Sequence, residues 1–524
     1  MTPPPLRPVP SRAGLALSAQ SRREFLRLLA LTSAVPLSAS RLLAEISRAP
    51  QPARPLKFIV AGAGLAGLCA AYELEKLGHQ CVILEADGGH VGGRARTLRL
   101  QDGLYGEAGA MRIPEVHQVT RHYVRELGLT LRPFVASNDQ AYYFLRGQRA
   151  RIKDVDALKK LYALTEKERA MSPADIWKTS LVGRLEKMSA AEKADLLAMA
   201  PTTPGVKTLD QLSLQQLFEA DGFSPEAIDL LAVTSGQEAI MGSAATEHLR
   251  EEMENVWNLS FDEIVGGTDR LPKAFADRLK SKPRTGCEII RLEQDANRKR
   301  VAAVFRNRKN NGAEEREEGD FLLCTLPLPV LGRIETPGFS GPKLRSIRQL
   351  TYDSSTKVLA VAKRRFWEMD DGIYGGGSFT DLPTATTYYP ADNARAKDPA
   401  VSAKPAVFLA SYSWGQHARR LGILEPAVRE QVALEHIRKM HPQLAEKNMV
   451  TRTVSWSWDR HPWSGGAFAW FNPGQHSALH RHIVEPEGRI HFAGEHASFT
   501  HTWMQGALES ALRVVKEVLA RAGE

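Results

Sequence analysis

Two short apolar runs near the start of the chain are separated by a glycine-rich turn and a segment of helix-forming residues. Residues 58–61 are apolar and lead into the pattern Gly62-x-Gly64-x-x-Gly67, and residues 65–77 favour a helix that Gly78 would end. A second apolar run, residues 81–84, ends on Glu85. The pattern predicts a strand, a tight turn, a helix and a second strand, which together begin a βαβ unit.

The spacing within this unit indicates dinucleotide binding. One glycine turns the chain, one lets the backbone approach a pyrophosphate, and one lets the helix close on the sheet, while the N-terminus of the helix faces the phosphates. Glu85 lies 18 residues beyond Gly67, close to where such a fold places an acid for the ribose hydroxyls. A lone glycine pattern also occurs in loops without a ligand, but here a strand, a helix and an acid accompany it.

Other hydrophobic patterns place the remaining elements. Residues 151–258 are charged and rich in Leu, Ala, Lys and Glu, which predicts helices, and residues 287–292 and 301–305 alternate as paired strands. Buried strands are expected over 320–327 and 489–495, a mixed sheet over 336–484, and an amphipathic helix from about 502 to 519. The expected fold is α/β. It has a discontinuous Rossmann-like domain (55–113, 259–335 and 485–524), a mixed-sheet domain (114–150 and 336–484) and a helical insertion (151–258).

Composition limits the classes of function. The chain has 524 residues, 43% hydrophobic and 25% charged, which suits two or three globular domains. A formal net charge of +9 is modest for this length, and the basic residues are interspersed with acids, so we expect no nucleic-acid partner. Four cysteines without a CxxC pair, and no histidines at ligand spacing, predict neither a disulfide framework nor a metal site.

The first 48 residues have the pattern of a targeting segment. The sequence SRREFLR, from Ser21 to Arg27, precedes a mildly apolar run over 28–37 and three small residues, 38–40. Together these resemble a twin-arginine export signal; a basic N-terminal arm is the alternative. The apolar run is too short to span a bilayer and no other stretch is long enough. We therefore expect a periplasmic or secreted protein without stable membrane insertion, whose mature part begins after Ser40.

After Glu85 comes a second glycine turn followed by a cation, Gly92-Gly93-Arg94, which suits a charge-assisted contact with a pyrophosphate. With this motif the chain resembles the flavin-dependent amine oxidase family, and most of all bacterial L-amino-acid oxidases. The resemblance covers most of residues 55–150 and 255–524 and implies FAD as the cofactor. The residues that it implies around FAD are Gly62, Ala63, Gly64, Leu65, Ala66, Gly67, Glu85, Ala86, Gly92, Gly93, Arg94, Gly109, Ala110, Met111, Arg112, Ile289, Gly494, Glu495, Trp503 and Met504.

The same resemblance implies a carboxylate site. In L-amino-acid oxidases an arginine in a Gly-x-Met-Arg-x-Pro segment binds the substrate carboxylate, and Arg112 has that position. A guanidinium suits this role because it offers two parallel donors and stays charged when buried. Tyr412 resembles a second carboxylate donor, and its alternatives nearby are Tyr388, Tyr389 and Trp414.

Two further positions resemble residues beside the flavin. Lys357 is the one lysine in the apolar strand expected over 355–361. It is similar to the family's catalytic lysine, which lies next to the reactive flavin nitrogen through a water and stabilises charge on reducing oxygen. An edge-strand gatekeeper is the alternative interpretation. Trp503 resembles an aromatic wall of the substrate pocket.

Taken together, the resemblance implies FAD-dependent oxidative deamination of an L-amino acid by molecular oxygen, giving a 2-oxo acid, ammonia and hydrogen peroxide. Alternatives on the same fold are a polyamine or monoamine oxidase and an amino-acid 2-monooxygenase; a flavin carrier without turnover is the alternative from another class. No cysteine occurs where monoamine oxidases link their flavin, so non-covalent FAD is expected. Aromatic residues favour large apolar or aromatic substrates, and a homodimer is the default oligomer. His496 and His501 lie close to the pocket in sequence, but no general base is assigned.

Overall fold

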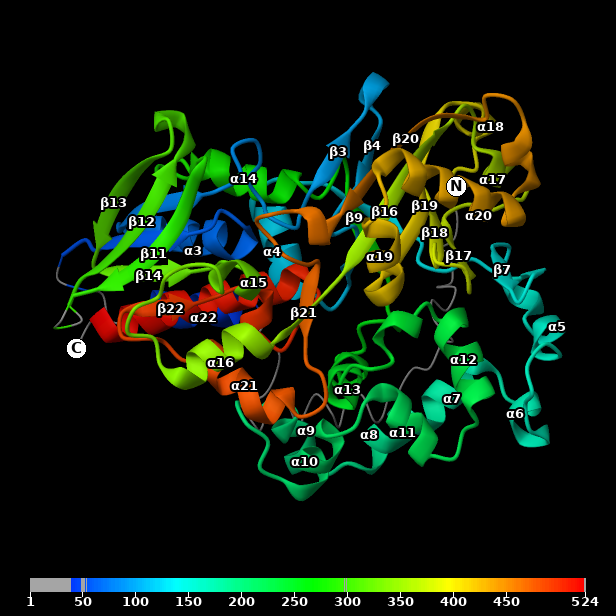
Figure 1. The fold of residues 1–524 in the computed structure, drawn as a ribbon, viewed down its shortest axis with the longest axis horizontal. Helices are drawn as coiled ribbons and strands as arrows, with labels where there is room; N and C mark the ends of the chain where they lie inside the picture. The colour runs from blue at the N-terminus through cyan, green and yellow to red at the C-terminus, as the bar shows by residue number, and fades with distance from the viewer. Residues whose placement is uncertain (1–38, 49–51, 53, 296, 298, 523–524) are drawn as a thin grey trace, which may run out of the picture.

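The computed structural model describes residues 39–48, 52, 54–295, 297 and 299–522, and contains a five-stranded parallel sheet (Figure 1). Its strands lie in the order β10-β2-β1-β14-β22, and every neighbouring pair is parallel. Their bounds are β1 (Lys57–Ala61), β2 (Gln80–Glu85), β10 (Arg284–Thr285), β14 (Phe321–Cys324) and β22 (Ile490–Phe492). Distant parts of the chain therefore share one sheet, which confirms the discontinuous Rossmann-like fold.

Two layers cover this sheet because successive side chains of a strand point to opposite faces. Phe58 and Val60 of β1 pack on one face in a core shared with α3 (Leu65–Lys76) and α22 (Met504–Ala522). Ile59 and Ala61 point to the other face. That face is covered by an antiparallel sheet of β11 (Cys287–Gln294), β12 (Val301–Asn307) and β13 (Ala313–Gly319), which includes the predicted strand pair.

A second, seven-stranded sheet has the order β20-β16-β19-β18-β17-β7-β8. Only its β17–β7 pair is parallel, so the sheet is mixed, as expected. Within this sheet, Lys357 of the internal strand β16 is paired with Tyr412 of β19. The strands are β7 (Tyr142–Leu145), β8 (Gln148–Arg151), β16 (Ser355–Ala362), β17 (Gly376–Thr380), β18 (Thr386–Tyr389), β19 (Ala406–Trp414) and β20 (Val450–Ser457).

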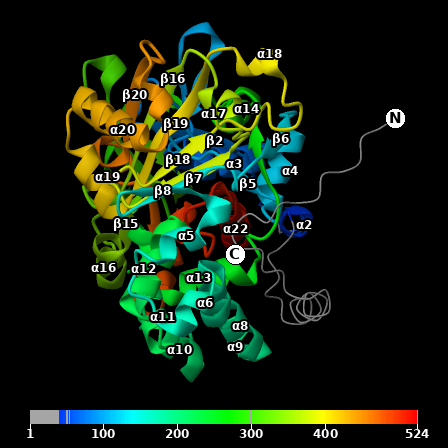
Figure 2. The same ribbon diagram turned by 90° about the vertical axis from the view of Figure 1, so that its right-hand side faces the viewer.

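Helices with a core of their own follow the β7–β8 hairpin and lie below the second sheet (Figure 2). Several begin with a Ser or Thr cap, as Ser213 does for α11, where its side chain accepts the Gln216 N–H. The elements are α5 (Asp156–Lys159), α6 (Glu166–Ala170), α7 (Pro173–Trp177), a π-helical turn (Lys178–Val182), α8 (Gly183–Lys187), α9 (Ala190–Asp195), α10 (Pro204–Asp210), α11 (Leu214–Ala220), α12 (Pro225–Thr234) and α13 (Ala245–Met253).

Shorter elements connect these layers. They include three small sheets of the described chain: one of β3 and β4, one of β15 (Thr351–Asp353) and β21, and one in the order β5-β9-β6. The bounds are β3 (Thr97–Arg99), β4 (Tyr105–Glu107), β5 (Ile113–Pro114), α4 (Gln118–Glu126), β6 (Leu131–Phe134), β9 (Phe261–Ile264), α14 (Arg270–Arg278), α15 (Leu328–Leu331), α16 (Gly341–Gln349), α19 (Gly415–Gly422), α20 (Pro426–Met440), β21 (Phe468–Trp470) and α21 (Gln475–Val484).

A helix near the N-terminus overlaps the end of the predicted leader. The motif from Ser21 to Arg27 lies outside the described residues, but α2 (Ala39–Ser47) is described and packs in the same core as α22. Leu42 and Ile46 are buried there, and Glu45 pairs with Lys516 of α22 at 2.8 Å. Residues 39–47 therefore pack on the folded body, while the predicted leader over residues 1–48 stays a prediction. In the described part of the chain, no helix is long and apolar enough to cross a membrane.

Candidate active site

One cavity, here called the glycine-loop cavity, lies at the carboxyl ends of β1 and β2, where ligands bind in open α/β sheets. It continues to the start of α22 and to Lys357. Most of the predicted cofactor residues line it: Gly62, Gly64, Leu65, Ala66, Glu85, Ala86, Gly92, Gly93, Arg94, Gly109, Ala110, Gly494, Glu495, Trp503 and Met504.

The first glycine turn shapes this cavity through its backbone. Gly62 has φ +99°, a left-handed conformation, and its N–H donates to the Leu84 carbonyl at 2.8 Å. A Cβ on Gly64 would meet no protein atom within 4 Å, so the chain leaves open space directly beside the N-terminus of α3. A Cβ on Gly67 would lie 2.1 Å from the Gly62 carbonyl oxygen. Gly67 therefore does not line the cavity but allows the close helix–strand packing.

The carboxylate of Glu85 is held at the end of β2 by two backbone donors. Its Oε2 accepts the Ala63 N–H and its Oε1 accepts the Asp87 N–H, both at 2.8 Å. Burial raises the pKa of Glu85, and these backbone donors oppose the shift. Ala63 itself is fully buried and contributes through this hydrogen bond, not as a lining residue.

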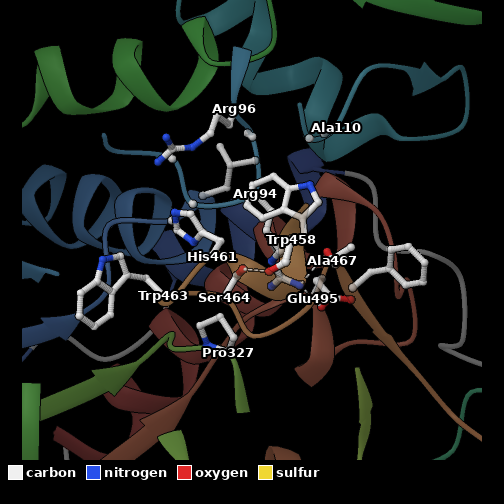
Figure 3. Close-up of a pocket in the computed structure, with 18 of the residues that line it drawn as sticks. Arg94, Arg96, Ala110, Pro327, Trp458, His461, Trp463, Ser464, Ala467 and Glu495 are labelled. Carbon is white, nitrogen blue, oxygen red and sulfur yellow. Dashed lines mark hydrogen bonds and ion pairs between the residues drawn. The ribbon is translucent and has the colours of Figure 1, made fainter. Parts of the chain in front are cut away.

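Arg94 and Glu495 form an ion pair within the cavity (Figure 3). The Nη1–Oε1 distance is 2.7 Å, and Glu495 also accepts the N–H groups of Ala469 at 3.1 Å and Thr502 at 3.0 Å. Burial disfavours the charged form of Arg94, but the Glu495 carboxylate raises its pKa. The two residues predicted to act separately on the cofactor are thus also partners of each other, and they connect the second glycine turn to the start of α22.

The donor set of this cavity fits a dinucleotide. His90 Nε2, Arg96 Nε and His461 Nδ1 are buried and have no hydrogen-bond partner among the described residues, and all three residues line the cavity. Buried polar atoms are nearly always paired in native proteins. Ribose hydroxyls and phosphate oxygens would satisfy these atoms, and the open space at Gly64 would admit a pyrophosphate at the N-terminus of α3.

A second cavity adjoins the first and contains Arg112, so we call it the Arg112 cavity. Met111 and Arg112 line this cavity and not the glycine-loop cavity. Six residues line both: Ala110, Tyr412, Phe468, Thr502, Trp503 and Met504. Aromatic side chains form much of the wall of the Arg112 cavity: Trp257, Tyr412, Trp414, Phe468, Trp470, Phe499 and Trp503.

Arg112 is a buried cation without a carboxylate partner in the described part of the chain. Its exposed fraction is 8%, its Nη1 donates to the Tyr388 hydroxyl at 3.1 Å, and its guanidinium carbon lies 4.8 Å from the ring centre of Trp257. An unpaired charge in such a position is costly unless a ligand compensates it. The arrangement is suited to an anion that enters the cavity.

An acid that the sequence did not single out holds two walls of this cavity. Glu251 accepts the indole N–H of Trp257 at 2.8 Å and that of Trp503 at 2.9 Å. The guanidinium carbon of Arg112 lies 5.9 Å from the ring centre of Trp503, so both indoles flank the same cation. Nothing in the local sequence distinguishes Glu251 from Glu252 or Glu254, because the two tryptophans come from different parts of the chain.

Glu254 is a second acid on the wall of the Arg112 cavity. Burial and the nearby carboxylates of Glu509 and Glu251 raise the pKa of Glu254 to about 8. Its side chain has no hydrogen-bond or ion-pair partner among the described residues.

Lys357 lies on the wall of the glycine-loop cavity and is 2% exposed. Its Nζ donates to the carbonyls of Gly109 at 2.6 Å and Glu107 at 3.2 Å, and lies 4.4 Å from the ring centre of Tyr412. Burial lowers the pKa of Lys357. The lysine is on an internal strand with β20 on one side and β19 on the other, so it is not an edge-strand gatekeeper.

The structure separates the tyrosine candidates. Tyr412 lines both cavities, whereas Tyr388 is the residue that hydrogen-bonds Arg112. Tyr389 points into a different core, where its hydroxyl contacts Ser378 and His441. Ile289, like Ala63 and Gly67, lines neither cavity. Its side chain packs in the core between the two layers of the dinucleotide-binding fold. An alternating strand pattern does not reveal which of its residues reach a neighbouring cavity.

The chain matches the model of the flavin containing amine oxidoreductases over residues 65–519. The protein belongs to this family. Among its relatives are the L-amino-acid oxidase of Siganus canaliculatus, 31% identical over 88% of this chain and 84% of the relative, and the flavin-dependent L-tryptophan oxidase RebO of Lentzea aerocolonigenes, 34% identical over 89% and 98%.

Solved structures of amine oxidoreductases share the fold. Putrescine oxidase bound to putrescine matches with a TM-score of 0.70 and 19% identity, covering 89% of this chain and all of that one. Cyclohexylamine oxidase from Brevibacterium oxydans matches with a TM-score of 0.68 and 18% identity over 90% and 99%. The protein is therefore a flavin-dependent amine oxidoreductase that acts on amino or amine substrates with oxygen as acceptor.

Proposed function

We propose that this amine oxidoreductase oxidises L-amino acids, releasing a 2-oxo acid, ammonia and hydrogen peroxide. The observation that carries the proposal is Arg112, a buried guanidinium without a carboxylate partner in the described chain, in a cavity that adjoins the glycine-loop cavity. A simple amine has no anionic group to compensate this charge. The relatives named as L-amino-acid oxidases support the same substrate class.

The proposed cofactor is non-covalent FAD in the glycine-loop cavity. Glu85 would accept the ribose hydroxyls, the N-termini of α3 and α22 would face the pyrophosphate and the flavin ring, and no cysteine is among the residues that line the cavity. Bound there, FAD would supply the two-electron redox chemistry of amine oxidation and of oxygen reduction. All other contributions come from the chain.

The chain would hold the substrate by its carboxylate and surround it with apolar walls. Arg112 provides the donors at one side of the cavity, and its Nη1 donates to the Tyr388 hydroxyl, which helps to fix the guanidinium. Trp257 and Trp503, fixed by Glu251, exclude water from this charge pair, which strengthens it. Tyr412 and Trp503 line both cavities and would place the α-carbon at the border between them. Such orientation contributes a large share of the rate acceleration.

Lys357 would act on oxygen after the substrate has been oxidised. It lines the same cavity as the start of α22, so its ammonium group would be a donor for the charge that develops as oxygen is reduced. Its hydrogen bonds to the carbonyls of Gly109 and Glu107 fix the ammonium group.

The proposal is tested by peroxide release from the flavin-loaded protein with L-amino acids, their D-enantiomers and the matching decarboxylated amines. The expected signal is confined to L-amino acids and is accompanied by one equivalent of ammonia. A signal with amines alone would overturn the proposal, and release of an amide in place of peroxide would assign the chain to the monooxygenases.

We also propose that the protein is exported through the twin-arginine pathway to the periplasm or the medium. The support is the SRREFLR motif, which lies before the described residues, and the fact that this pathway carries folded proteins, as a flavin-loaded enzyme must be. Replacement of Arg22 and Arg23 by lysine should retain the protein in the cytoplasm, as measured by fractionation.

A further inference from the structure

A buried histidine with one free ring nitrogen lines the Arg112 cavity. His501 is 3% exposed, and its Nδ1 lies 2.9 Å from the Oε1 of Glu247. Its Nε2 is buried and has no hydrogen-bond partner among the described residues. A polar atom left unpaired in the interior costs free energy, so a partner supplied by a ligand would stabilise this site.

Glu247 decides which nitrogen carries the proton. Burial alone would raise the pKa of Glu247, but Arg250, His501 and the Phe471 N–H hold it well below its usual range. The distances are 3.1 Å to Arg250 Nη2 and 2.9 Å to the Phe471 nitrogen. An ionised acceptor at Nδ1 keeps the proton there and leaves the lone pair on Nε2.

The other charged or titratable groups near this pair are Arg250, on the same helix as Glu247, and Arg112, Glu251 and Glu254 on the wall of the same cavity. The cation of Arg250 is offset by Glu247. Burial lowers the pKa of the neighbouring histidines, so they are neutral at pH 7: His476, His480 and His496. The His501 ring therefore lies next to an ion pair and neutral imidazoles.

The residue after His501 has a strained backbone conformation and lies between two residues that line the cavities. Thr502 has φ +68°, a left-handed conformation that is uncommon for a β-branched residue, and its N–H donates to Glu495 at 3.0 Å. His501 on one side of it lines the Arg112 cavity, and Trp503 on the other side lines both cavities. Strained residues that persist are concentrated at functional sites.

We infer that His501 is the proton acceptor for the α-ammonium group of the substrate, an inference that rests on the proposed function. An amino acid enters as a zwitterion, and its nitrogen has no lone pair until a proton leaves. In the transfer an N–H bond of the ammonium group breaks, an Nε2–H bond forms, and the positive charge moves to the imidazole. The neutral amine has the lone pair that would allow the α-hydrogen to leave as hydride and give the protonated imino acid, and the enzyme's redox cofactor would supply the acceptor for that hydride.

The test compares His501→Asn and the wild type in anaerobic reduction of the bound flavin by an L-amino acid over a range of pH. A general base contributes about 10²- to 10⁴-fold, so we expect a loss of that size at neutral pH. The loss should shrink at alkaline pH, where the free substrate is already a neutral amine. Free imidazole should partly restore the rate of His501→Ala. Glu247→Gln keeps an oxygen at Nδ1 but not the charge, so in this variant the fall in rate toward acidic pH should move to another pH but should not disappear.

A matched control is His480→Asn. His480 is also buried, its Nδ1 also lacks a partner among the described residues, and it does not line either cavity. We expect its pH profile to match that of the wild type, and bound flavin and melting temperature will show that each variant is folded. Two results would overturn the inference. One is a loss of rate in His501→Asn that is equal at every pH. The other is a fall in rate toward acidic pH that is still present in His501→Asn but is absent in Glu254→Gln. Absence of L-amino-acid oxidation by the wild type would instead refute the proposed function.

Discussion

Replacement of Glu251 by glutamine probes how the Arg112 cavity is held in shape. In the wild type each carboxylate oxygen of Glu251 accepts one indole N–H, from Trp257 at 2.8 Å and from Trp503 at 2.9 Å. Glutamine has one carbonyl oxygen and an NH₂ group in the same place. It can therefore accept only one of the two indoles, and the other indole N–H faces a second donor.

The size of the effect follows from this single lost hydrogen bond. A buried donor left unpaired costs about 1–3 kcal/mol, and the displaced indole also loses part of its interaction with the Arg112 guanidinium, about 0.5–2 kcal/mol. If this energy is lost on substrate binding, at about 1.4 kcal/mol per tenfold change, KM should rise by at least about tenfold. The rate at saturation should change much less, because Glu251 acts on the walls of the cavity through the two indoles.

A neighbouring acid provides the control. Glu252 also accepts an indole N–H, that of Trp177 at 3.0 Å, but it does not line the Arg112 cavity. We expect Glu252→Gln to lower the melting temperature about as much as Glu251→Gln does while leaving KM unchanged. Steady-state kinetics with an L-amino acid and thermal melting of both variants measure the two effects. Equal KM values for the wild type and Glu251→Gln would refute the idea that this carboxylate shapes the cavity.

Three further predictions concern the cofactor, oxygen and the N-terminal helix. Gly64→Ala should leave the melting temperature of the flavin-free protein unchanged, because the new Cβ meets no protein atom within 4 Å, but should reduce the flavin retained after gel filtration. Lys357→Met should slow reoxidation by oxygen by about 10²-fold and reduction by substrate less, as measured by stopped-flow absorbance of each half-reaction. A chain that begins at residue 49 should have a free energy of unfolding about 3–5 kcal/mol lower than one that begins at residue 39, because it lacks the buried side chains of Leu42 and Ile46. Equal denaturation midpoints for the two chains would contradict this.

Much of the dinucleotide-binding part of the fold could be predicted from the sequence because its signals are local. A strand, a glycine turn, a helix and an acid at fixed spacing are read within about thirty residues, and the structure shows β1, α3 and β2 in that order. The same holds for the apolar strands that became β14, β16 and β22. Arg112 was found by its motif, which is also local.

The rest of the site depends on contacts between distant segments. Glu251 joins two tryptophans, one of them 252 positions away, and Glu247 meets His501 across 254 positions. No periodicity or spacing encodes such a pairing. The hydrogen bond from Arg112 to Tyr388 is a further example, because it depends on how the strands of Tyr388 and Tyr412 lie beside the guanidinium.

The carboxylate-binding role of Arg112 is tested most directly by anaerobic reduction of the flavin in the wild type and in Arg112→Met. The two reductants are an L-amino acid and the amine that lacks only its carboxylate. Loss of one partner of a buried ion pair costs about 3–5 kcal/mol, so the variant should bind the amino acid at least a hundredfold more weakly and the amine about as well as the wild type does. Equal losses for both reductants would contradict carboxylate recognition by Arg112, and with it the assignment to L-amino acids.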